Sequence, residues 1–399
     1  MRVALRKKVA RAVHAGHPWI YRDAITPPKF DPPDGAVVLV TNDAGRPIGR
    51  GFWTRTTPLA IRMLTTDASE DLDALLGARL VAALDARLAV LERARTNAFR
   101  WVHGEADRLP GVHLDVYADV AAVRFDGPGA RAFYGVRDFA ARVMAAGARL
   151  GLSALIERKR GPRGGNDDTD DGEARALVGV VPAGERAVLE NGLSFGVDLA
   201  HGQKGGLFLD QRDNRARVGA MARGRRVLNL FGYTGAFSVY AAAGGAASTT
   251  TVDVAAGAIA SARRNFERNG LPLANHEFVA ADVFAFVTEA LKARRRFDLV
   301  ISDPPSFAPS RKALPTALPA YRRLHRLCAG LVEKGGVFCA ASCSSHVSDA
   351  DFLDSVEAGC REAGRRFALD QLHGAGADHP VAEFFPEGRY LKFAIGTLT

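Results

Sequence analysis

The stretch "RVLNLFGYTGAF" (226–237) decides the fold of this chain. A short apolar run with strand character ends at Phe231, a glycine-containing turn follows, and helical sequence begins directly after it. Six further runs of this kind follow, separated by helical sequence: "STTTVDV", "HEFVAAD", "FDLVISD", "GVFCAAS", "RRFALDQL" and "RYLKFAIGTL". Near-continuous apolar strands separated by helices are typical of a parallel sheet covered on both faces. The sequence therefore predicts an α/β domain over residues 187–399, built on a seven-stranded, mostly parallel sheet.

Two blocks of a different character precede this sheet. In residues 1–68, "GAVVLVTNDAGRPIGRGFWTRTTPLAIRML" alternates short β-type runs with turn signals, which predicts a small all-β module that ends near Thr65. Residues 69–186 are expected to form an α+β domain. They open on one helical stripe of leucines, formed by Leu72, Leu75, Leu76, Leu80, Leu84, Leu88 and Leu91.

The rest of this middle block mixes strand and helix signals. "HLDVYADVAAVRF" (113–125) is typical of a β-hairpin, "GARAFYGVRDFAARVMAAGARL" (129–150) predicts one helix, and "SALIERKR" (153–160) predicts another strand. The acidic, glycine-rich segment 161–175 has the composition of a loop. Strand signals resume at "ALVGVV" and "RAVLENGLSFGVDL".

Composition narrows the class of protein. The chain has 399 residues and is 47% hydrophobic, which is enough for two or three domains. Because it shows neither an apolar run of membrane-spanning length nor a signal peptide, we expect a cytoplasmic protein with no membrane partner and with reduced thiols. The spacing of Cys328, Cys339, Cys343 and Cys360 does not resemble a zinc site, so no metal is expected.

Positive charge is concentrated at the N-terminus. The formal net charge is +9, and residues 1–62 carry eleven Lys and Arg against four Asp. Such a surplus is typical of a surface that binds a polyanion. A solvated surface in an arginine-rich protein explains the same surplus equally well.

Polar groups follow several of the predicted strands of the α/β domain. Asp253, Asp282, Asp303 and Cys343 each stand where an apolar run ends. A single acidic residue at such a place is usually a helix N-cap. In an open α/β sheet, however, ligands bind outside the carboxyl ends of the strands, so several such residues favour a shared pocket.

The first turn indicates which cofactor this pocket takes. "NLFGYTGAFS" has only Gly232 and Gly235, so it lacks the glycine-rich cradle of a dinucleotide fold. A tight turn and a helix N-terminus suit the carboxylate of a small zwitterion. Asp253 follows about twenty residues later, where an acid accepts from ribose hydroxyls, and Asp282 is expected beside an adenine. This layout predicts S-adenosylmethionine, bound by the two acids and by the turn residues Phe231, Tyr233, Thr234 and Gly235.

"DPPSF" (303–307) is a rigid turn, because two prolines exclude helix and hold the chain extended. We expect Pro304, Pro305 and Phe307 to hold a planar base near the methyl group of the cofactor. The alternative is a turn with a structural role only.

Cys343 poses a separate question. A cysteine in an apolar run is usually a small core side chain, and Cys328, Cys339 and Cys360 fit that description. Cys343 stands at a strand end beside the predicted pocket, where methyl transfer to carbon would use it. A thiolate that attacks cytosine C6 makes C5 nucleophilic. Lys204 or Arg212 could favour that thiolate if "GQKGGLFLDQRDNR" (202–215) folds over the site.

These motifs resemble those of PUA-domain-containing class I methyltransferases that form 5-methylcytosine in large-subunit (23S) ribosomal RNA. The matching segments are "GHPWIYRDAI" (16–25), "GRGFW" (49–53), "GEADRLPGVHLDVYAD" (104–119), "GQKGGLFLDQRDNR" (202–215), "VLNLFGYTGAFSVYAAAGGA" (227–246), "DPPSF" and "SCS" (342–344). The resemblance implies an RNA-binding PUA β-barrel over 1–68, a central domain over 69–186 and a Rossmann-like catalytic domain over 187–399.

The resemblance also implies roles for individual residues. Cys343 would be the nucleophile. The cofactor would be held by Asn229, by the turn that follows it and by the acids Asp253, Asp282 and Asp303. Lys204, Asp210 and Arg212 lie in a signature segment, and Lys204 and Arg212 are taken as substrate contacts. Many RNA cytosine-5 enzymes carry a second cysteine after Pro-Pro, where this chain has Ser306. The base that removes the C5 proton therefore stays open between Asp303 and a water.

Two other functions stay open at this point. One is a related methyltransferase that acts on a purine nitrogen, in which Cys343 is only structural. The other is a non-catalytic RNA-binding factor of ribosome assembly. The sequence leaves open the target nucleotide, naked RNA or assembled subunit as substrate, and whether the protein is a homodimer.

Overall fold

Seven strands form the sheet predicted around residues 226–237. The computed structural model describes residues 1–26, 31–158, 174–200 and 206–399. The strands are β13 (Arg226–Leu230), β14 (Ser248–Asp253), β15 (His276–Ala280), β16 (Phe297–Ser302), β17 (Val332–Ser342), β18 (Phe367–His373) and β19 (Lys392–Leu398). Their order is β15-β14-β13-β16-β17-β19-β18. The first five are parallel, and β19 is antiparallel to both of its neighbours, which confirms the mostly parallel sheet.

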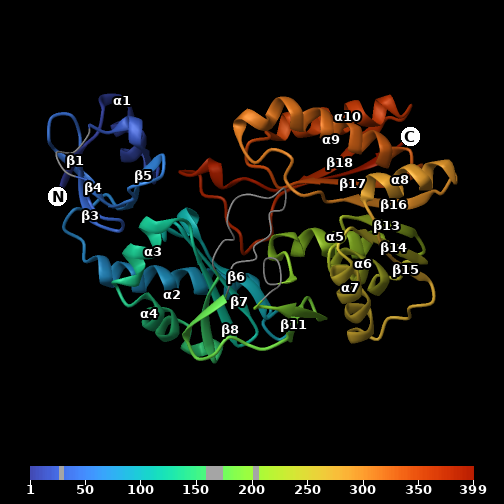
Figure 1. Cartoon of the computed structure of the whole chain (residues 1–399), viewed down its shortest axis with the longest axis horizontal. Helices are drawn as coiled ribbons and strands as arrows, with labels where there is room; N and C mark the ends of the chain where they lie inside the picture. The colour runs from blue at the N-terminus through green and yellow to red at the C-terminus, as the bar shows by residue number, and fades with distance from the viewer. Residues whose placement is uncertain (27–30, 159–173, 201–205) are drawn as a thin grey trace.

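Helices cover both faces of this sheet because its strands are apolar on both sides. One face carries α5 (Arg212–Met221), α6 (Ala236–Ala243) and α7 (Ala256–Arg268), and the other carries α8 (Val283–Lys292), α9 (Leu314–Ala329) and α10 (Asp349–Glu362) (Figure 1). Val227, Leu228 and Leu230 of β13 are fully buried between the two layers. The prediction of a doubly covered α/β domain is confirmed.

The middle of the chain forms a second sheet, of order β10-β9-β8-β7-β6. Its strands are β6 (Ala98–His103), β7 (Val112–Tyr117), β8 (Val120–Phe125), β9 (Ala154–Arg158) and β10 (Ala174–Val178). The predicted hairpin is confirmed as β7 and β8, which pair in antiparallel register. The leucine stripe is confirmed on α2 (Leu72–Val90), where Leu72, Leu76, Leu80 and Leu84 are buried. Residues 161–173 of the predicted loop 161–175 lie outside the described residues.

One helix prediction in this part was wrong. Residues 129–150 form two helices, α3 (Pro128–Gly135) and α4 (Phe139–Ala146), and not one. Asp138, which precedes α4, has a φ of 49°, so the backbone turns there in a left-handed conformation that no α-helix accommodates. The break lets Phe133, Tyr134 and Phe139 all enter the core of this part.

The N-terminal part is a five-stranded sheet of order β1-β3-β4-β5-β2. It comprises β1 (Arg2–Ala4), β2 (Trp19–Tyr21), β3 (Val37–Thr41), β4 (Pro47–Trp53) and β5 (Leu59–Thr65), with one helix, α1 (Lys7–His14), that the sequence analysis did not predict. The end of the β module at Thr65 is as expected. Within the described ranges, no helix has the length and apolar character that a membrane crossing requires.

A hairpin joins the middle part to the large sheet. It consists of β11 (Glu185–Glu190) and β12 (Leu193–Asp198), so the boundary expected after residue 186 falls inside β11. Val188, Phe195 and Val197 of the hairpin pack with β6, β8 and β9 on one side and with α6 and α7 on the other. This shared core fixes the middle part beside the carboxyl edge of the large sheet.

Candidate functional site

The ends of β13, β14, β16 and β17 meet at one edge, because their registers align. Leu230 pairs with Val252 on one side and with Ser302 on the other, and Ser302 pairs with Ala340. The residues that follow these positions therefore share one edge. They include the turn after β13, Asp253, Asp303 and Cys343. A common pocket formed by these residues stays a prediction.

The turn after β13 has an unusual backbone. Phe231 and Tyr233 have φ values of 58° and 46°, in the left-handed region that non-glycine residues rarely adopt, and Gly235 has a φ of 75°. A Cβ on Gly235 would lie 2.7 Å from the Cβ of Ala262, so only glycine fits. Strained residues of this kind persist where the surrounding structure holds them, and they cluster at ligand sites.

Asp253 connects this turn to the neighbouring strand. Its Oδ2 accepts a hydrogen bond from the backbone N–H of Tyr233 at 2.8 Å, and its Oδ1 accepts one from Ala255 at 2.9 Å. A carboxylate has about four acceptor positions, so both oxygens can still accept from hydroxyl groups. Thr234 is held by Gly206, whose carbonyl oxygen accepts from its Oγ1 at 3.1 Å.

The turn also presents an acceptor that lacks a donor. Asn229 is 1% exposed, and its Nδ2 donates to Ser238 Oγ at 3.0 Å. Its Oδ1 is buried and has no hydrogen-bond partner among the described residues. An orphaned acceptor beside a tight glycine turn fits a small ligand that brings N–H donors, such as the amino group of an amino-acid moiety.

Asp282 acts as a helix N-cap, which is the usual role of a single acid that follows a strand. Its side chain caps α8, with Oδ1 accepting from the backbone N–H of Ala285 at 2.8 Å. The residue is exposed at the edge of the sheet. The cap accounts for one of its oxygens, and a contact with an adenine stays a prediction.

The Asp-Pro-Pro loop is tied to the end of β17. Ser344 Oγ donates to the carbonyl oxygen of Ala308 at 2.8 Å. Phe307 packs on Tyr321 with ring centroids 4.7 Å apart, and Ser342 Oγ donates to the Tyr321 hydroxyl at 3.1 Å. Pro304 is buried while Pro305 is exposed. Asp303 accepts from Gln211 Nε2 at 3.0 Å, which orients its carboxylate at the edge.

Cys343 differs from the other three cysteines. Cys328, Cys339 and Cys360 are fully buried, whereas Cys343 is partly exposed. Its neighbours Ser342 and Ser344 are 0% and 2% exposed, and both are anchored in the hydrogen bonds just described. Burial raises the pKa of Cys328, Cys339 and Cys360 to about 12, so these three thiols stay protonated.

The sequence analysis missed a cation beside this strand end. Lys392 of β19 pairs with Ser342 in the sheet and is 2% exposed. Its Nζ donates to the carbonyl oxygens of Ser344 at 2.5 Å and Val347 at 2.7 Å. Burial lowers the pKa of Lys392, while Asp349 and Cys343 act to raise it. A lone lysine inside the apolar run "RYLKFAIGTL" was the signal that could have identified it.

The two cations named from the sequence are placed differently. Lys204 lies outside the described residues. Arg212 is 1% exposed and makes two 2.9 Å hydrogen bonds to Asp378, so its charge is already paired inside the protein. For this reason Arg212 is not kept as a substrate contact. Asp210, from the same segment, accepts from the Tyr390 hydroxyl at 2.6 Å.

A cavity of about 400 Å³ opens beside this edge. Its walls come from all three parts of the chain and include Trp19, Arg100, Arg124, Phe208, Ser345 and Tyr390. Ser345 is two residues beyond Cys343, and Phe208 packs edge-on against Tyr233 of the strained turn at 5.3 Å. The cavity is thus bordered by a residue that packs on the turn and by a residue that follows the end of β17. Among the described residues, no cluster of acids, histidines or cysteines is arranged to hold a metal ion.

Comparison with known proteins identifies the class. The profile of a PUA-like domain matches residues 3–66, and that of an S-adenosylmethionine-dependent methyltransferase matches residues 170–381. The chain therefore belongs to the S-adenosylmethionine-dependent methyltransferase family, and its cofactor is S-adenosylmethionine. The glycine turn and the orphaned acceptor of Asn229 fit the amino-acid end of that molecule.

Relatives narrow the class further. The chain is 33% identical to Ribosomal RNA large subunit methyltransferase I of Aeromonas salmonicida, over 94% of each chain. It is 35% identical to Ribosomal RNA large subunit methyltransferase of Deinococcus radiodurans, over 98% of this chain and 96% of that one. Among solved structures, it resembles the methyltransferase SMU.776 in complex with SAH, with 25% identity over all of both chains and a TM-score of 0.85.

Proposed function

We propose that this protein methylates C5 of a cytosine in large-subunit ribosomal RNA, with Cys343 as the nucleophile. The observation that carries the proposal is the position of Cys343. It is the cysteine that is partly exposed, it stands at the carboxyl edge of the sheet, and the serines on either side of it are anchored in the protein. The names of the relatives support ribosomal RNA as the substrate.

The chemistry follows from a thiolate at this position. The Cys343 sulfur adds to C6 of the cytosine, and the C5–C6 double bond gives up its electrons so that C5 becomes nucleophilic. S-adenosylmethionine supplies the methyl group that C5 takes up. The C5 proton then leaves to a base, and the C6–S bond breaks as the double bond forms again. Asp303, held by Gln211, is our candidate for that base.

The cofactor residues are proposed from the same edge. The turn 231–235 and Asn229 would meet the amino-acid end, and Asp253 would accept from ribose hydroxyls. Asp282 would lie beside the adenine, and Asp303 would lie near the transferred methyl group. Pro304, Pro305 and Phe307 would form one wall of the space for the target base. This arrangement is supported by the aligned strand ends.

Lys392 completes the proposed site. A buried ammonium group that lies under the 344–347 backbone favours a negative charge on the neighbouring sulfur, because a thiolate is stabilised by nearby positive charge. Its hydrogen bonds to Ser344 and Val347 also fix the backbone that follows Cys343.

Nucleoside mass spectrometry tests the proposal. Purified protein is incubated with large-subunit ribosomal RNA and labelled S-adenosylmethionine, and 5-methylcytidine is the expected product. A methylated purine would instead identify the enzyme as a nitrogen methyltransferase. RNA binding without any affinity for S-adenosylmethionine in calorimetry would indicate a non-catalytic assembly factor.

A covalent trap tests the role of Cys343 directly. RNA that contains 5-fluorocytosine should form a denaturant-resistant adduct, because fluorine cannot leave as a proton. The adduct should map to Cys343 and should be absent from Cys343→Ala. Cys339→Ala, which changes a buried cysteine of β17 just before Cys343, is the control that should still form it. Full activity in Cys343→Ala would contradict the proposed nucleophile.

A further inference from the structure

The segment between β18 and β19 is longer than its connection requires. The two strands are antiparallel neighbours, which a turn of two residues can join. Here residues 374–391 intervene, and we call this segment the strap. In Figure 1 the strap leaves the large sheet and runs across the middle of the molecule toward the N-terminal part.

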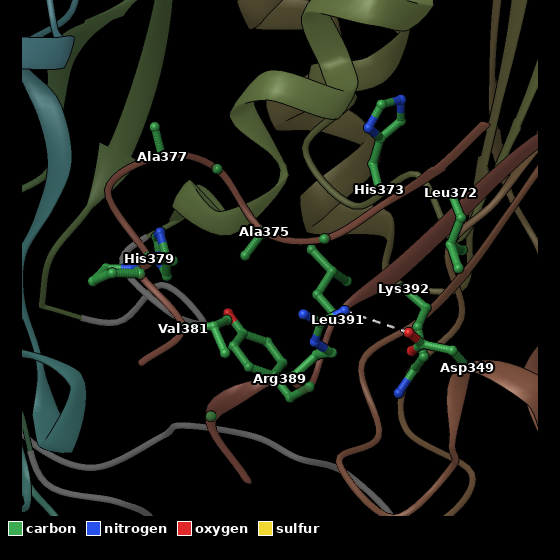
Figure 2. A pocket seen from close by; sticks show the side chains of 15 residues that line it. Asp349, Leu372, His373, Ala375, Ala377, His379, Val381, Arg389, Leu391 and Lys392 are labelled. Atoms are coloured by element: carbon green, nitrogen blue, oxygen red, sulfur yellow. Dashed lines mark ion pairs between the residues drawn. The ribbon is translucent and has the colours of Figure 1, made fainter. Parts of the chain in front are cut away.

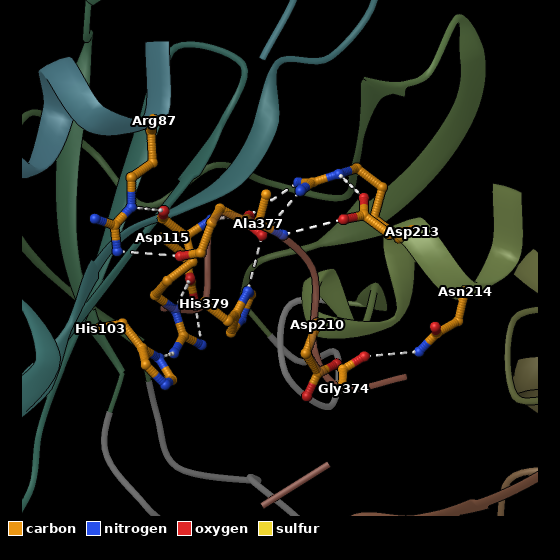
Figure 3. Close-up of polar contacts among 12 residues, drawn as sticks. Arg87, His103, Asp115, Asp210, Asp213, Asn214, Gly374, Ala377 and His379 are labelled. Atoms are coloured by element: carbon orange, nitrogen blue, oxygen red, sulfur yellow. Dashed lines mark hydrogen bonds and ion pairs between the residues drawn. The ribbon is translucent and has the colours of Figure 1, made fainter. Parts of the chain in front are cut away.

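The strap is bound first to the catalytic part. Asp378 is fully buried, and its two carboxylate oxygens each accept from a terminal nitrogen of Arg212 at 2.9 Å. The backbone N–H of Ala377 donates to Asp213 at 3.0 Å (Figure 3). The Tyr390 hydroxyl donates to Asp210 at 2.6 Å. These contacts all come from the segment that precedes α5 and from α5 itself.

The same aspartate is also bound to the middle part. Asp378 Oδ2 accepts from the backbone N–H of Arg100 on β6 at 2.8 Å. Its carbonyl oxygen accepts from Arg87 of α2 at 3.1 Å, and Arg87 makes two 2.6 Å hydrogen bonds to Asp107. Burial acts to raise the pKa of Asp378, but His379 and Arg212 hold it well below its usual range, so the carboxylate is ionised.

The strap then reaches the N-terminal part. Phe385 packs edge-on against Trp19 with ring centroids 4.7 Å apart, and Oε1 of Glu387 lies 3.2 Å from Nε2 of His17. Phe384 stacks under the guanidinium of Arg108 from the middle part at 4.7 Å. One segment therefore contacts all three parts of the chain, and Asp378 is where the catalytic and middle parts meet on a single side chain.

The strap also forms one wall of the 400 Å³ cavity. Phe385, Glu387, Gly388 and Tyr390 line it together with Trp19 and Arg100. Any movement of the middle part relative to the catalytic part would change the shape of this cavity and its approach to Ser345, two residues beyond Cys343. The hydrogen bonds from Arg100 and Arg87 to Asp378 resist such movement, because breaking them leaves buried polar groups unpaired.

We propose that Asp378 is a positioning residue, which joins β6 to Arg212 so that the strap holds the middle and N-terminal parts in the placement that brings the RNA to the catalytic edge. Asp378 acts through Arg212 and Arg100 and contacts neither the cofactor nor the reacting base. The inference rests on the proposed RNA substrate but not on which base is methylated.

Two variants separate this role from a general loss of folding. Asp378→Asn keeps the shape and removes the charge. The double variant Arg212→Met with Asp378→Leu removes both charges together, which avoids the cost of leaving one of them buried without its partner. Asp370→Asn on β18 is the matched control, because Asp370 is exposed and accepts a surface hydrogen bond from Thr397 at 3.0 Å.

Transfer of labelled methyl groups to large-subunit RNA gives KM and kcat, and calorimetry gives cofactor affinity. For the folded double variant we expect kcat/KM for RNA to fall at least tenfold, with KM taking most of the change and with cofactor affinity within twofold of the wild type. Asp370→Asn should match the wild type. An unchanged kcat/KM in the double variant would overturn the proposal, and so would a loss of activity that only parallels a loss of cofactor affinity.

Hydrogen exchange gives a readout that needs no substrate. The backbone N–H of Arg100 should exchange faster in the double variant, since it loses its acceptor, while the amides of β13 should keep their protection. Unchanged exchange at Arg100 would contradict the proposed link. If the wild type transfers no methyl group to ribosomal RNA, the proposed function fails, and this exchange measurement still decides the role of Asp378.

Discussion

Lys392 is a buried cation that the sequence analysis did not predict, and its effect on methyl transfer can be measured. A lysine that is 2% exposed pays a desolvation cost, and here two backbone carbonyl groups and the negative charge of Asp349 offset it. The cavity that it borders is about 310 Å³ in volume, and Figure 2 shows Lys392 beside Asp349, which forms an ion pair with Arg389 at 3.6 Å.

Lys392→Met should lower methyl transfer at least tenfold while cofactor affinity stays near that of the wild type. The positive charge favours the thiolate form of Cys343, and methionine keeps most of the side-chain volume without that charge. The rate at which iodoacetamide alkylates Cys343 at pH 7 should fall with the activity. Lys334→Met, which changes an exposed lysine on β17, is the control. An unchanged alkylation rate would show that Lys392 acts on the backbone alone.

Gly235→Ala should weaken cofactor binding and destabilise the protein by about 1–2 kcal/mol, the usual cost of a left-handed conformation for a residue with a Cβ. The added methyl group also has to displace Ala262. Gly257→Ala in α7 is the matched control, because its Cβ would meet no atom within 4 Å and alanine favours a helix. Thermal unfolding and calorimetry measure both effects, and equal behaviour of the two variants would contradict this account.

At this scale, the sequence predicts residues whose role depends on local order along the chain. The strand-end position of Cys343 and the acids at the carboxyl edge follow from the pattern of apolar runs. Arg212 does not, because its partner Asp378 is 166 residues away and the pair forms only when the strap returns to α5. The signature segment places an arginine at position 212, but it does not show which residue that arginine contacts.

The N-terminus of α8 offers a test at the scale of a single element. Asp282→Ser should keep the stability within about 0.5 kcal/mol, because serine is as good an N-cap as aspartate. If Asp282 also contacts the adenine, the same variant should bind the cofactor several-fold more weakly. Asp282→Ala should lose about 1 kcal/mol of stability in addition. Unchanged cofactor affinity in the serine variant would limit Asp282 to its role as a cap.

Elements with a strong period were predictable, and elements set by tertiary contacts were not. The leucine stripe gave α2 and the alternating run gave the β7–β8 hairpin. The split of residues 129–150 depends on the left-handed Asp138, which no period in the sequence reveals. The position of β19 between β17 and β18 likewise depends on strand pairing in the folded sheet, which the order of the strands along the chain does not show.

The pH dependence of stability belongs to the scale of the whole molecule. His325 of α9 is fully buried, its Nε2 has no hydrogen-bond partner in the described parts of the chain, and burial lowers its pKa to about 4. The unfolded chain, with an ordinary histidine pKa near 6.5, therefore binds more protons between these two values. The contribution of His325 to stability is complete above about pH 6.5 and should fall by about 3 kcal/mol as the pH drops to 4.

Denaturant unfolding at a series of pH values checks this expectation. His325→Gln should show a shallower loss of unfolding free energy between pH 6.5 and 4 than the wild type. His14→Gln, which changes an exposed histidine of α1, should keep the wild-type slope. Equal slopes for the wild type and His325→Gln would mean that the acid sensitivity arises elsewhere.

The three-part division of the chain was accessible from the sequence, because each part has its own pattern. The N-terminal sheet ends at Thr65, as its turn signals predicted. The way in which the parts are joined was not accessible, since it depends on a hairpin that shares its core with both neighbours and on the strap, which contacts all three parts.

Because the strap joins the three parts of the chain, we expect the protein to change shape little when it binds RNA. The RNA is then the molecule that must deform. If the parts of the protein keep their places, the work of bringing base and sulfur together falls on the nucleic acid. Turning a nucleotide out of a stack costs least where the strand is already unpaired. RNA whose target region is not yet base-paired should therefore bind this enzyme at a lower energetic cost than the same RNA within an assembled subunit.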